Sequence, residues 1–371
     1  MTTHPDDPHF LRLAFVRGVG SVAAHKLLSE LGDISAVFNA SNATLSRIVG
    51  DVCARKIAAA TDAETQAKID AALAWLNANA DHHLLTWAHP NYPTALLESG
   101  DAPLVIYAKG RIELLSRRAI AMVGSRNCSQ GGSDTAEAFA QAFAERGVTV
   151  VSGMALGIDA ASHVGALRAK GGDCGSTIAV IGTGIDRVYP ARNKVLAHSI
   201  AEQGLMLSEY PLGTPPLPAN FPKRNRIISG LSLGVLVVEA STASGSLITA
   251  RFAGEQGREV FAIPGSIHST FHKGCHHLIK QGAKLVETAN DVLEELRFET
   301  TASSSETVTQ TVTGKSTSNC LLKFIEHTPI DVDTLVVRSA LAVDQVVTEL
   351  TMLELEGRIE QLPGGRWQRR G

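Results

Sequence analysis

The middle of the chain alternates short β-rich runs with helical stretches, and this alternation constrains the fold more than any other feature. Five apolar runs, each closed by small polar residues, precede helical segments; they read AIAMVGS, VTVVSG, TIAVIGTG, LGVLVVEAS and EVFAIPGS. Strands separated by helices pair in parallel, because each helix returns the chain to the start of the next strand. We therefore predict an α/β domain over residues 81–298, with a parallel sheet and helices on both faces.

The two ends of the chain lack this alternation. Residues 1–80 carry Ala and Leu at helical spacing, so we expect a helical domain similar to helix-hairpin-helix or SAM-like domains. Its Gly18 and Gly20 would let a helix start approach a phosphate, or would simply close a tight turn between helices. Residues 299–318 are polar and rich in Ser and Thr, which predicts a flexible linker. Residues 319–371 predict helix, turn, helix and hairpin, the order of a winged helix.

Charge and cysteine usage limit the class of protein. The formal net charge is −3, so a nucleic-acid site must be a local cluster of cations. Five cysteines without paired spacing are typical of reduced thiols in an intracellular protein. The first ten residues are acidic where a signal peptide would be basic, and no apolar run reaches about 18 residues. We expect a cytoplasmic protein that makes no membrane contact.

The loop after the first β-rich run, GSRNCSQGG, is a candidate anion site. Ser125, Asn127 and the amides of the following helix can donate hydrogen bonds to an oxyanion, and Arg126 adds a charge. The loop lacks the G-x-G-x-x-G pattern, and the next strand ends at Ser152 rather than at an acidic residue that would hold a ribose. The pattern disfavours NAD, and we expect no cofactor.

A basic run follows a proline-rich loop in the segment LPANFPKRNRIISG. Lys223, Arg224 and Arg226 lie within four residues, with no carboxylate nearby in the sequence, where a helix begins. A solvated basic turn is the ordinary interpretation. Cations beside an aromatic ring, here Phe221, are also what a groove for single-stranded nucleic acid uses: charge for the backbone and a ring for base stacking.

Two further loops of small residues follow predicted strands. Gly182 ends the third run, and Ser244, Gly245 and Ser246 open a helix after the fourth. The carboxyl ends of parallel strands meet at one edge of a sheet, where open α/β sheets bind ligands. We therefore expect these loops, the GSRN loop and the basic run to converge on one site.

Neither a metal centre nor a catalytic group is predicted. The segment HSTFHKGCHHLI places His272 and His276 at helical spacing, but a zinc site needs further fixed ligands, and Gly274 is expected to interrupt the helix. Ser152 and His163 could form a nucleophile–base pair only if His163 turned toward the strand end, whereas its helix is expected to face elsewhere.

Two alternative functions stay open. Nucleoside-monophosphate N-glycosidases of related folds use a PGGxGT loop before a helix with a catalytic Glu; here the loop reads EASTASGS, and no Glu follows until Glu255. A nucleotide-sensing DNA-binding regulator would use the winged helix. Its expected recognition helix, Val343–Glu354, carries Asp344, Glu349 and Glu354 and no Lys or Arg, which favours protein contact at least equally.

The motifs together resemble the DNA-processing protein A (DprA/Smf) family. The resemblance rests on MVGSRNCSQGG, VVSGMALGIDAASH, AVIGTGIDRVYPARN, LSEYPLGTPP, NFPKRNRIISGLS, VVEASTASGSLITA and AIPGSIHSTFHKGCHHLIKQGA, in that order. It implies a Rossmann-like fold, binding of single-stranded DNA, protection of incoming strands during natural transformation and loading of the RecA recombinase. It also implies a homodimer. The His-rich stretch at 268–277 replaces what is usually a Ser/Asn stretch.

Carried onto this sequence, the resemblance and the loop analysis define one expected DNA-binding set. It comprises Ser125, Arg126, Asn127, Ser152, Gly182, Phe221, Lys223, Arg224, Asn225, Arg226, Ser244, Gly245 and Ser246.

Overall fold

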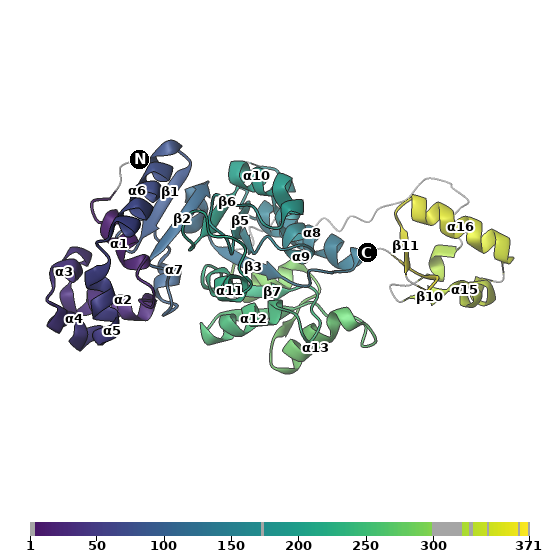
Figure 1. Cartoon of the computed structure of the whole chain (residues 1–371). Helices are drawn as coiled ribbons and strands as arrows, with labels where there is room; N and C mark the ends of the chain where they lie inside the picture. Colours follow the sequence, from purple (N-terminus) through teal and green to yellow (C-terminus); the bar gives the residue numbers. More distant parts are fainter. Residues whose placement is uncertain are drawn as a thin grey trace. The chain divides into compact units, whose positions relative to one another are not determined.

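The chain divides into two units, residues 1–297 and 298–371, in the computed structural model (Figure 1). The residues described are 4–171, 174–298, 321–325, 329–339, 341–362 and 364–369. The predicted linker, 299–318, and Pro363 of the expected wing turn lie outside the described residues.

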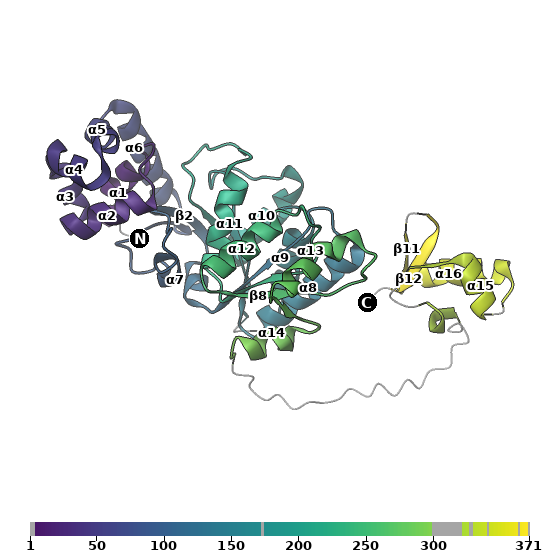
Figure 2. The same cartoon turned by 90° about the horizontal axis from the view of Figure 1, so that it is seen from below.

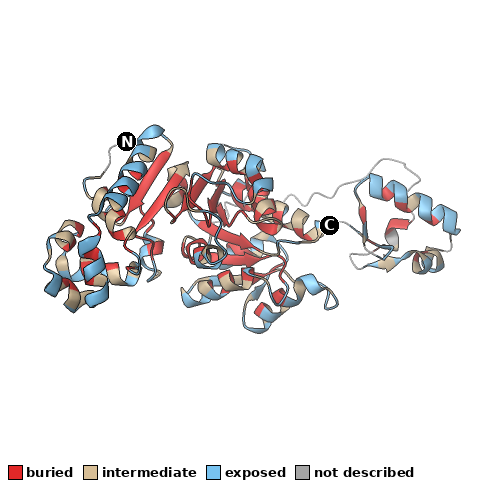
Figure 3. Cartoon of the chain, viewed as in Figure 1, coloured by how far each residue is buried: buried red, intermediate tan, exposed pale blue. Residues whose placement is uncertain are grey.

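A nine-stranded sheet organises the first unit, in the order β1-β2-β6-β5-β4-β3-β7-β8-β9. The strands are β1 (His82–Thr86), β2 (Val105–Gly110), β3 (Ala119–Val123), β4 (Thr149–Ser152), β5 (Thr177–Val180), β6 (Leu205–Ser208), β7 (Gly234–Val237), β8 (Glu259–Ala262) and β9 (Lys284–Leu285). Pairing is parallel from β6 to β9. The central strands are buried along their length (Figure 3).

The predicted α/β class is confirmed, with one difference at the edge of the sheet. The five β-rich runs of the sequence form β3, β4, β5, β7 and β8. β6 and β9 also lie outside the five predicted runs. At the edge, two more strands, β1 and β2, pair antiparallel with each other, and β2 pairs antiparallel with β6. They join without a full crossover helix between them, so they lie outside the β–helix alternation from which the parallel sheet was predicted.

Helices cover both faces of this sheet (Figure 2). On one face lie α8 (Gln130–Glu145), α9 (Ile158–Arg168) and α10 (Lys194–Gln203), with α14 (Ala289–Glu295) beside α8. The other face packs against α7 (Thr94–Leu97), α11 (Asn220–Gly230), α12 (Ser246–Glu255) and α13 (Lys273–Lys280). Short 3-10 turns are η1 (Ile112–Ser116), η2 (Ala191–Asn193) and η3 (Thr270–His272). Side chains that alternate along each strand, such as Ala121 and Val123, enter the core under α11 and α12.

The order of the strands reverses at β3. From β3 the chain proceeds outward through β4, β5 and β6, then crosses back to place β7 on the other side of β3. The loops after β3 and β7 therefore leave the same edge of the sheet and turn to opposite faces. Such a reversal opens a crevice at the carboxyl ends of the strands.

From residue 4 onward, six helices precede the sheet: α1 (Asp7–Ala14), α2 (Ser21–Leu31), α3 (Ile34–Asn39), α4 (Asn42–Val49), α5 (Asp51–Ala59) and α6 (Ala63–Ala78). They share a core with β1 and β2. Trp75 of α6 stacks on His82, with ring centroids 4.2 Å apart, and accepts a hydrogen bond from His82 Nδ1 at its carbonyl. Gly18, in the turn between α1 and α2, has φ +92°, and Lys56 Nζ donates to the adjacent Arg17 carbonyl.

The second unit is smaller and has its own core. It contains η4 (Leu321–Lys323), β10 (Ile330–Asp331), α15 (Val332–Ser339), α16 (Val343–Leu355), β11 (Ile359–Leu362) and β12 (Arg366–Arg369). β11 and β12 pair antiparallel, which confirms the predicted hairpin. In neither unit does any described helix combine the length and apolar character that a membrane crossing requires.

Candidate nucleic-acid interface

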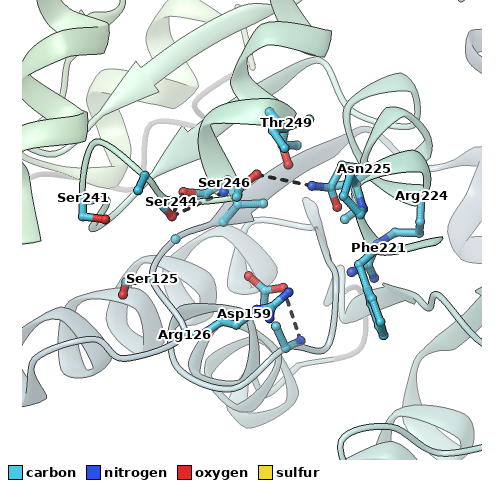
Figure 4. A pocket seen from close by; sticks show the side chains of 18 of the residues that line it. Ser125, Arg126, Asp159, Phe221, Arg224, Asn225, Ser241, Ser244, Ser246 and Thr249 are labelled. Carbon is cyan, nitrogen blue, oxygen red and sulfur yellow. Dashed lines mark hydrogen bonds between the residues drawn. The ribbon is translucent and has the colours of Figure 1, made fainter. Parts of the chain in front are cut away.

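A cavity of about 360 Å³ opens where the sheet reverses, at the carboxyl edge between β3 and β7 (Figure 4). Three segments surround it: the loop after β3, the first turns of α11, and the loop that opens α12. It brings together nine residues of the expected set: Ser125, Arg126, Asn127, Phe221, Arg224, Asn225, Ser244, Gly245 and Ser246. The others, Ser152, Gly182, Lys223 and Arg226, do not line it.

The loop after β3 presents an unpaired cation. Arg126 is exposed, and within the described part of the chain its guanidinium has no ion-pair or hydrogen-bond partner. The loop beneath it is fixed: Ser125 N donates to Glu239 O at 2.7 Å, and Asn127 N donates to Ser125 Oγ at 3.2 Å. A Cβ at Gly157 would meet the carbonyl oxygen of Ser125 at 2.3 Å, so only glycine lets α9 pack this closely. Arg126 is thus a free charge on a rigid support.

The start of α12 faces this cation across the cavity (Figure 4). The hydroxyls of Ser244 and Ser246 lie 2.7 Å apart, and Ser246 N reaches Ser244 Oγ only at 3.4 Å. Asn225 Nδ2 approaches Gly245 O at 3.5 Å. The positive end of a helix dipole, rotatable hydroxyls and lightly engaged donors are suited to an oxyanion.

Phe221 stands at one side of the cavity, on the first turn of α11 (Figure 4). It is half-buried and rests on Gly182, where a Cβ would come within 2.9 Å of the ring. Gly182 thereby supports the cavity from behind without lining it. Lys223 is exposed, with Nζ 3.7 Å from Glu209. A separation of this length at an exposed side chain contributes little, so Lys223 is available to a ligand.

Arg224 is buried beneath the cavity. Its Nη1 donates to Gly153 O at 2.6 Å and also to Val180 O, which ties α11 to the ends of β4 and β5. The neighbouring Asp159 carboxylate is also buried. Burial outweighs the attraction between the two groups, so it raises the pKa of Asp159 and lowers the pKa of Arg224 to about 10. Arg224 stays charged at neutral pH and lies beside Asp159 in the cavity floor.

Arg226 points away from the cavity into an ion-pair cluster. Nη1 and Nη2 contact Glu209 at 3.1 and 2.8 Å, and Nε contacts Asp101 at 2.8 Å. Burial acts to lower the pKa of Arg226, but Glu209 and Asp101 raise it above its ordinary value. Ser21 of α2 donates to the other oxygen of Asp101, so the cluster reaches the N-terminal helices.

The basic run has no carboxylate nearby in the sequence, but the folded chain brings carboxylates to all three of its cations. Glu209, Asp101 and Asp159 are distant in the sequence and meet these cations only in the folded chain. Sequence analysis missed all three. One available signal was helical spacing: Arg224 precedes Ile228 by four residues, which puts it on the apolar face of α11. Of the three cations, only Lys223 is exposed.

Ser152 and His163 do not form a catalytic pair. Ser152 is buried and donates to Met122 O at 2.7 Å, whereas His163 Nδ1 lies 2.7 Å from Thr177 Oγ1. Burial lowers the pKa of His163 to about 3. As predicted, His163 turns away from the strand end.

The expected break of the helix at Gly274 is wrong. α13 begins at Lys273 and continues through Gly274, where a Cβ would meet the carbonyl oxygens of Ala240 and Ser241 at 2.7 Å. Glycine is used here for close packing against the strand end rather than to end a helix. Among the described residues, no three His, Cys, Asp or Glu side chains form a group that could hold a metal.

Fold and site define a doubly wound α/β protein with a cavity at its topological switch point. The sequence model of the DNA recombination-mediator protein A family matches residues 83–297, and that of the DprA winged helix domain matches residues 306–365. The chain belongs to the DNA recombination-mediator protein A family.

Relatives extend the match beyond the sheet. The chain is 43% identical over 305 residues to protein Smf of Escherichia coli, which covers 80% of each chain. It is 51% identical over 207 residues to DNA processing protein DprA of Streptococcus pneumoniae, covering 56% of this chain and 72% of that one. The X-ray structure of the S. pneumoniae protein has a TM-score of 0.67 at 37% identity, covering 80% of this chain and 100% of that one. DNA processing protein A of Helicobacter pylori has a TM-score of 0.52 at 28% identity, covering 58% and 96%.

Proposed function

We propose that the cavity and the surface beside it bind single-stranded DNA without strong sequence preference. One observation carries the proposal: Arg126 is an unpaired cation that faces the start of α12 across a cavity, with Phe221 at its side. The Arg126 cation and the N-terminal end of α12 together suit a phosphate, and the Phe221 ring suits the face of a base. None of these groups is arranged to read base edges.

A relative supports the choice of single strands. The H. pylori structure is described as giving insight into the single-stranded DNA binding mode of that protein. A small cavity beside an aromatic ring favours a backbone whose bases are free to turn out, whereas the bases of a duplex stay stacked. We extend the binding of single strands to this chain on that basis.

We further propose a role in natural transformation. The protein would bind incoming single strands in the cytoplasm, protect them and load the RecA recombinase, acting as a homodimer. Two relatives are named DNA processing protein DprA, and this name supports a role in handling DNA. RecA loading is tested by following RecA-dependent ATP hydrolysis on a strand precoated with single-strand-binding protein, with and without this chain. Light scattering after gel filtration tests the dimer.

We propose binding rather than catalysis. Glu239, the first residue of the EASTASGS loop, is 1% exposed and accepts hydrogen bonds from both Ser129 N and Ser129 Oγ, at 2.9 and 2.6 Å. It holds the loop after β3 in place. Incubation with nucleoside monophosphates should release no base, and release that disappears in Glu239→Gln would favour the enzyme.

The binding proposal is tested by fluorescence anisotropy with a labelled single strand and with its duplex, each at two salt concentrations. We expect tighter binding of the single strand and an affinity that falls linearly with salt on logarithmic axes. Affinity that does not change with salt, or strong discrimination between unrelated strands of equal length, would contradict the proposal.

A further inference from the structure

We propose that Tyr189 is a second base-stacking platform, which extends the strand's path from the cavity along the segment between β5 and α10. The inference rests on the proposed function. It adds Tyr189 as a DNA contact and gives the direction in which the strand leaves the cavity. Tyr189 was not among the residues expected to bind DNA. The observation that carries it is an aromatic pair: the rings of Tyr189 and Phe221 have centroids 5.4 Å apart at an interplanar angle of 41°.

The pair leads from the cavity to the surface. Phe221 lines the cavity and is half-buried, whereas Tyr189 is 48% exposed and Val188 beside it is 36% exposed. Because the two rings are tilted, a base does not fit flat between them. A base leaving the cavity can instead lie on the free face of Tyr189, as aromatic platforms in single-strand grooves allow.

The segment that carries Tyr189 is anchored at three places. Asn193 Nδ2 donates to Met154 O and Ala155 O, at 2.9 and 3.3 Å, and Ala155 lines the cavity. Thr183 Oγ1 donates to Arg187 O at 3.0 Å. Asp186 accepts from Gly213 N at 2.9 and 3.0 Å. A large ring held half-exposed on a fixed segment forms a binding surface that loses little conformational entropy when a base stacks on it.

The same segment supplies charge for the backbone. Arg187, Arg192 and Lys194 are exposed, and none of the three lies within ion-pair distance of a carboxylate in the described part of the chain. The one acid among them, Asp186, is engaged by Gly213 N. Unpaired cations flanking a ring repeat the combination found in the cavity, where Arg126 accompanies Phe221. This repetition favours one continuous strand over an isolated nucleotide.

The test compares Tyr189→Ala, Tyr189→Phe and Val188→Ala in the full chain, with oligothymidine strands of about 4 and about 15 nucleotides as probes. The short strand occupies the cavity, and the long strand also reaches Tyr189. We expect Tyr189→Ala to weaken binding of the long strand about tenfold and binding of the short strand less than about twofold. Tyr189→Phe keeps the ring and should bind as the parent does, and Val188→Ala is the matched control.

Photo-crosslinking of the unsubstituted protein gives a readout that no folding defect can imitate. A long strand with a single 5-iodouracil, moved stepwise along it, should crosslink to Tyr189 at one or two positions only, identified by mass spectrometry of the peptide. Equal binding of the long strand by Tyr189→Ala and the parent, or equal weakening in Tyr189→Phe and Tyr189→Ala, overturns the inference. If the parent binds neither strand, the proposed function fails instead.

Discussion

Arg226 of α11 and Glu209, the residue after β6, form a buried two-point ion pair, with nitrogen–oxygen distances of 3.1 and 2.8 Å. Both side chains are 7% exposed. Asp101 meets the same guanidinium from the loop before β2, so three segments distant in the chain are joined at one cation. The pair holds the helix that carries Phe221 and Lys223 at the edge of the cavity, which makes Arg226 a positioning residue.

Loss of Arg226 should therefore act first on stability. Arg226→Ala leaves the Glu209 carboxylate buried without its partner, and removing one member of a buried pair lowers the free energy of unfolding by about 3–5 kcal/mol. Urea denaturation followed by circular dichroism measures it. Asp101→Ala is the control: Asp101 is 53% exposed, and its loss should have an effect below about 1 kcal/mol. An Arg226→Ala variant as stable as the parent but weak in DNA binding would make Arg226 a DNA contact.

The two exposed cations beside the cavity should carry much of the affinity. Each charge-assisted phosphate contact contributes about 1.5–3 kcal/mol, so Arg126→Ala with Lys223→Ala should weaken single-strand binding a hundredfold or more, roughly. The salt slope should fall by about 0.7 for each lost contact. Anisotropy titrations at several salt concentrations measure both quantities.

The matched control for that double variant is Arg168→Ala with Lys170→Ala. These exposed cations lie at and just beyond the C-terminal end of α9, at the opposite edge of the sheet from the cavity. We expect unchanged affinity and an unchanged salt slope. A similar loss in both double variants would show that net charge, rather than the site, governs binding.

The winged helix should be dispensable for single strands. α16 carries no Lys or Arg, and its exposed surface combines acids such as Asp344 and Glu354 with apolar Val343 and Leu355. A chain ended at Ser318 should bind a labelled strand within about threefold of the full chain, because the proposed phosphate contacts all lie in the first unit. If truncation abolishes binding and the Arg126/Lys223 double variant binds like the parent, the winged helix is the DNA site.

The sequence predicted five of the strands (β3, β4, β5, β7 and β8) and the convergence of the loops that follow them, because both follow from local patterns. An apolar run that stops at small residues before a helix defines a parallel strand and its carboxyl end, so the meeting of the GSRN loop with Ser244–Ser246 needed no further information. Arg126 was predicted on the same local ground to add a charge to this site.

The burial of Arg224 and Arg226 and their pairing with carboxylates could not be predicted from the sequence in the same way. Their partners come from the residue after β6, from α9 and from the loop before β2, and only the packing of α11 across the sheet brings them together. A run of cations looks the same whether it faces solvent or buried carboxylates. Tyr189 was missed for a related reason: the sequence does not show that its ring contacts Phe221, and only this contact connects it to the cavity.

The last prediction concerns pH, through His163. Thr177 Oγ1 donates to Val150 O at 2.8 Å and so accepts from His163 Nδ1, which places the single proton of the neutral ring on that nitrogen. Within the described residues His163 Nε2 has no partner, so protonation there would bury an unpaired charge. Burial first, and Arg224 second, lower the pKa of His163 to about 3, against 6.5 for an unperturbed imidazole.

The pKa of His163 is lower in the folded chain than in the unfolded chain. Between pH 6.5 and about 3, His163 therefore binds a proton in the unfolded chain but not in the folded chain. In that window His163 makes the free energy of unfolding fall as the pH falls, by about 1.4 kcal/mol per pH unit, and above it His163 has no effect. Asn keeps a donor toward Thr177 and does not titrate. Urea denaturation of His163→Asn between pH 7 and about 4.5 should therefore show a shallower loss of stability than the parent, whereas His198→Asn, at an exposed site on α10, should keep the parent slope. Equal slopes in the parent and His163→Asn would mean that His163 is not held neutral in the fold.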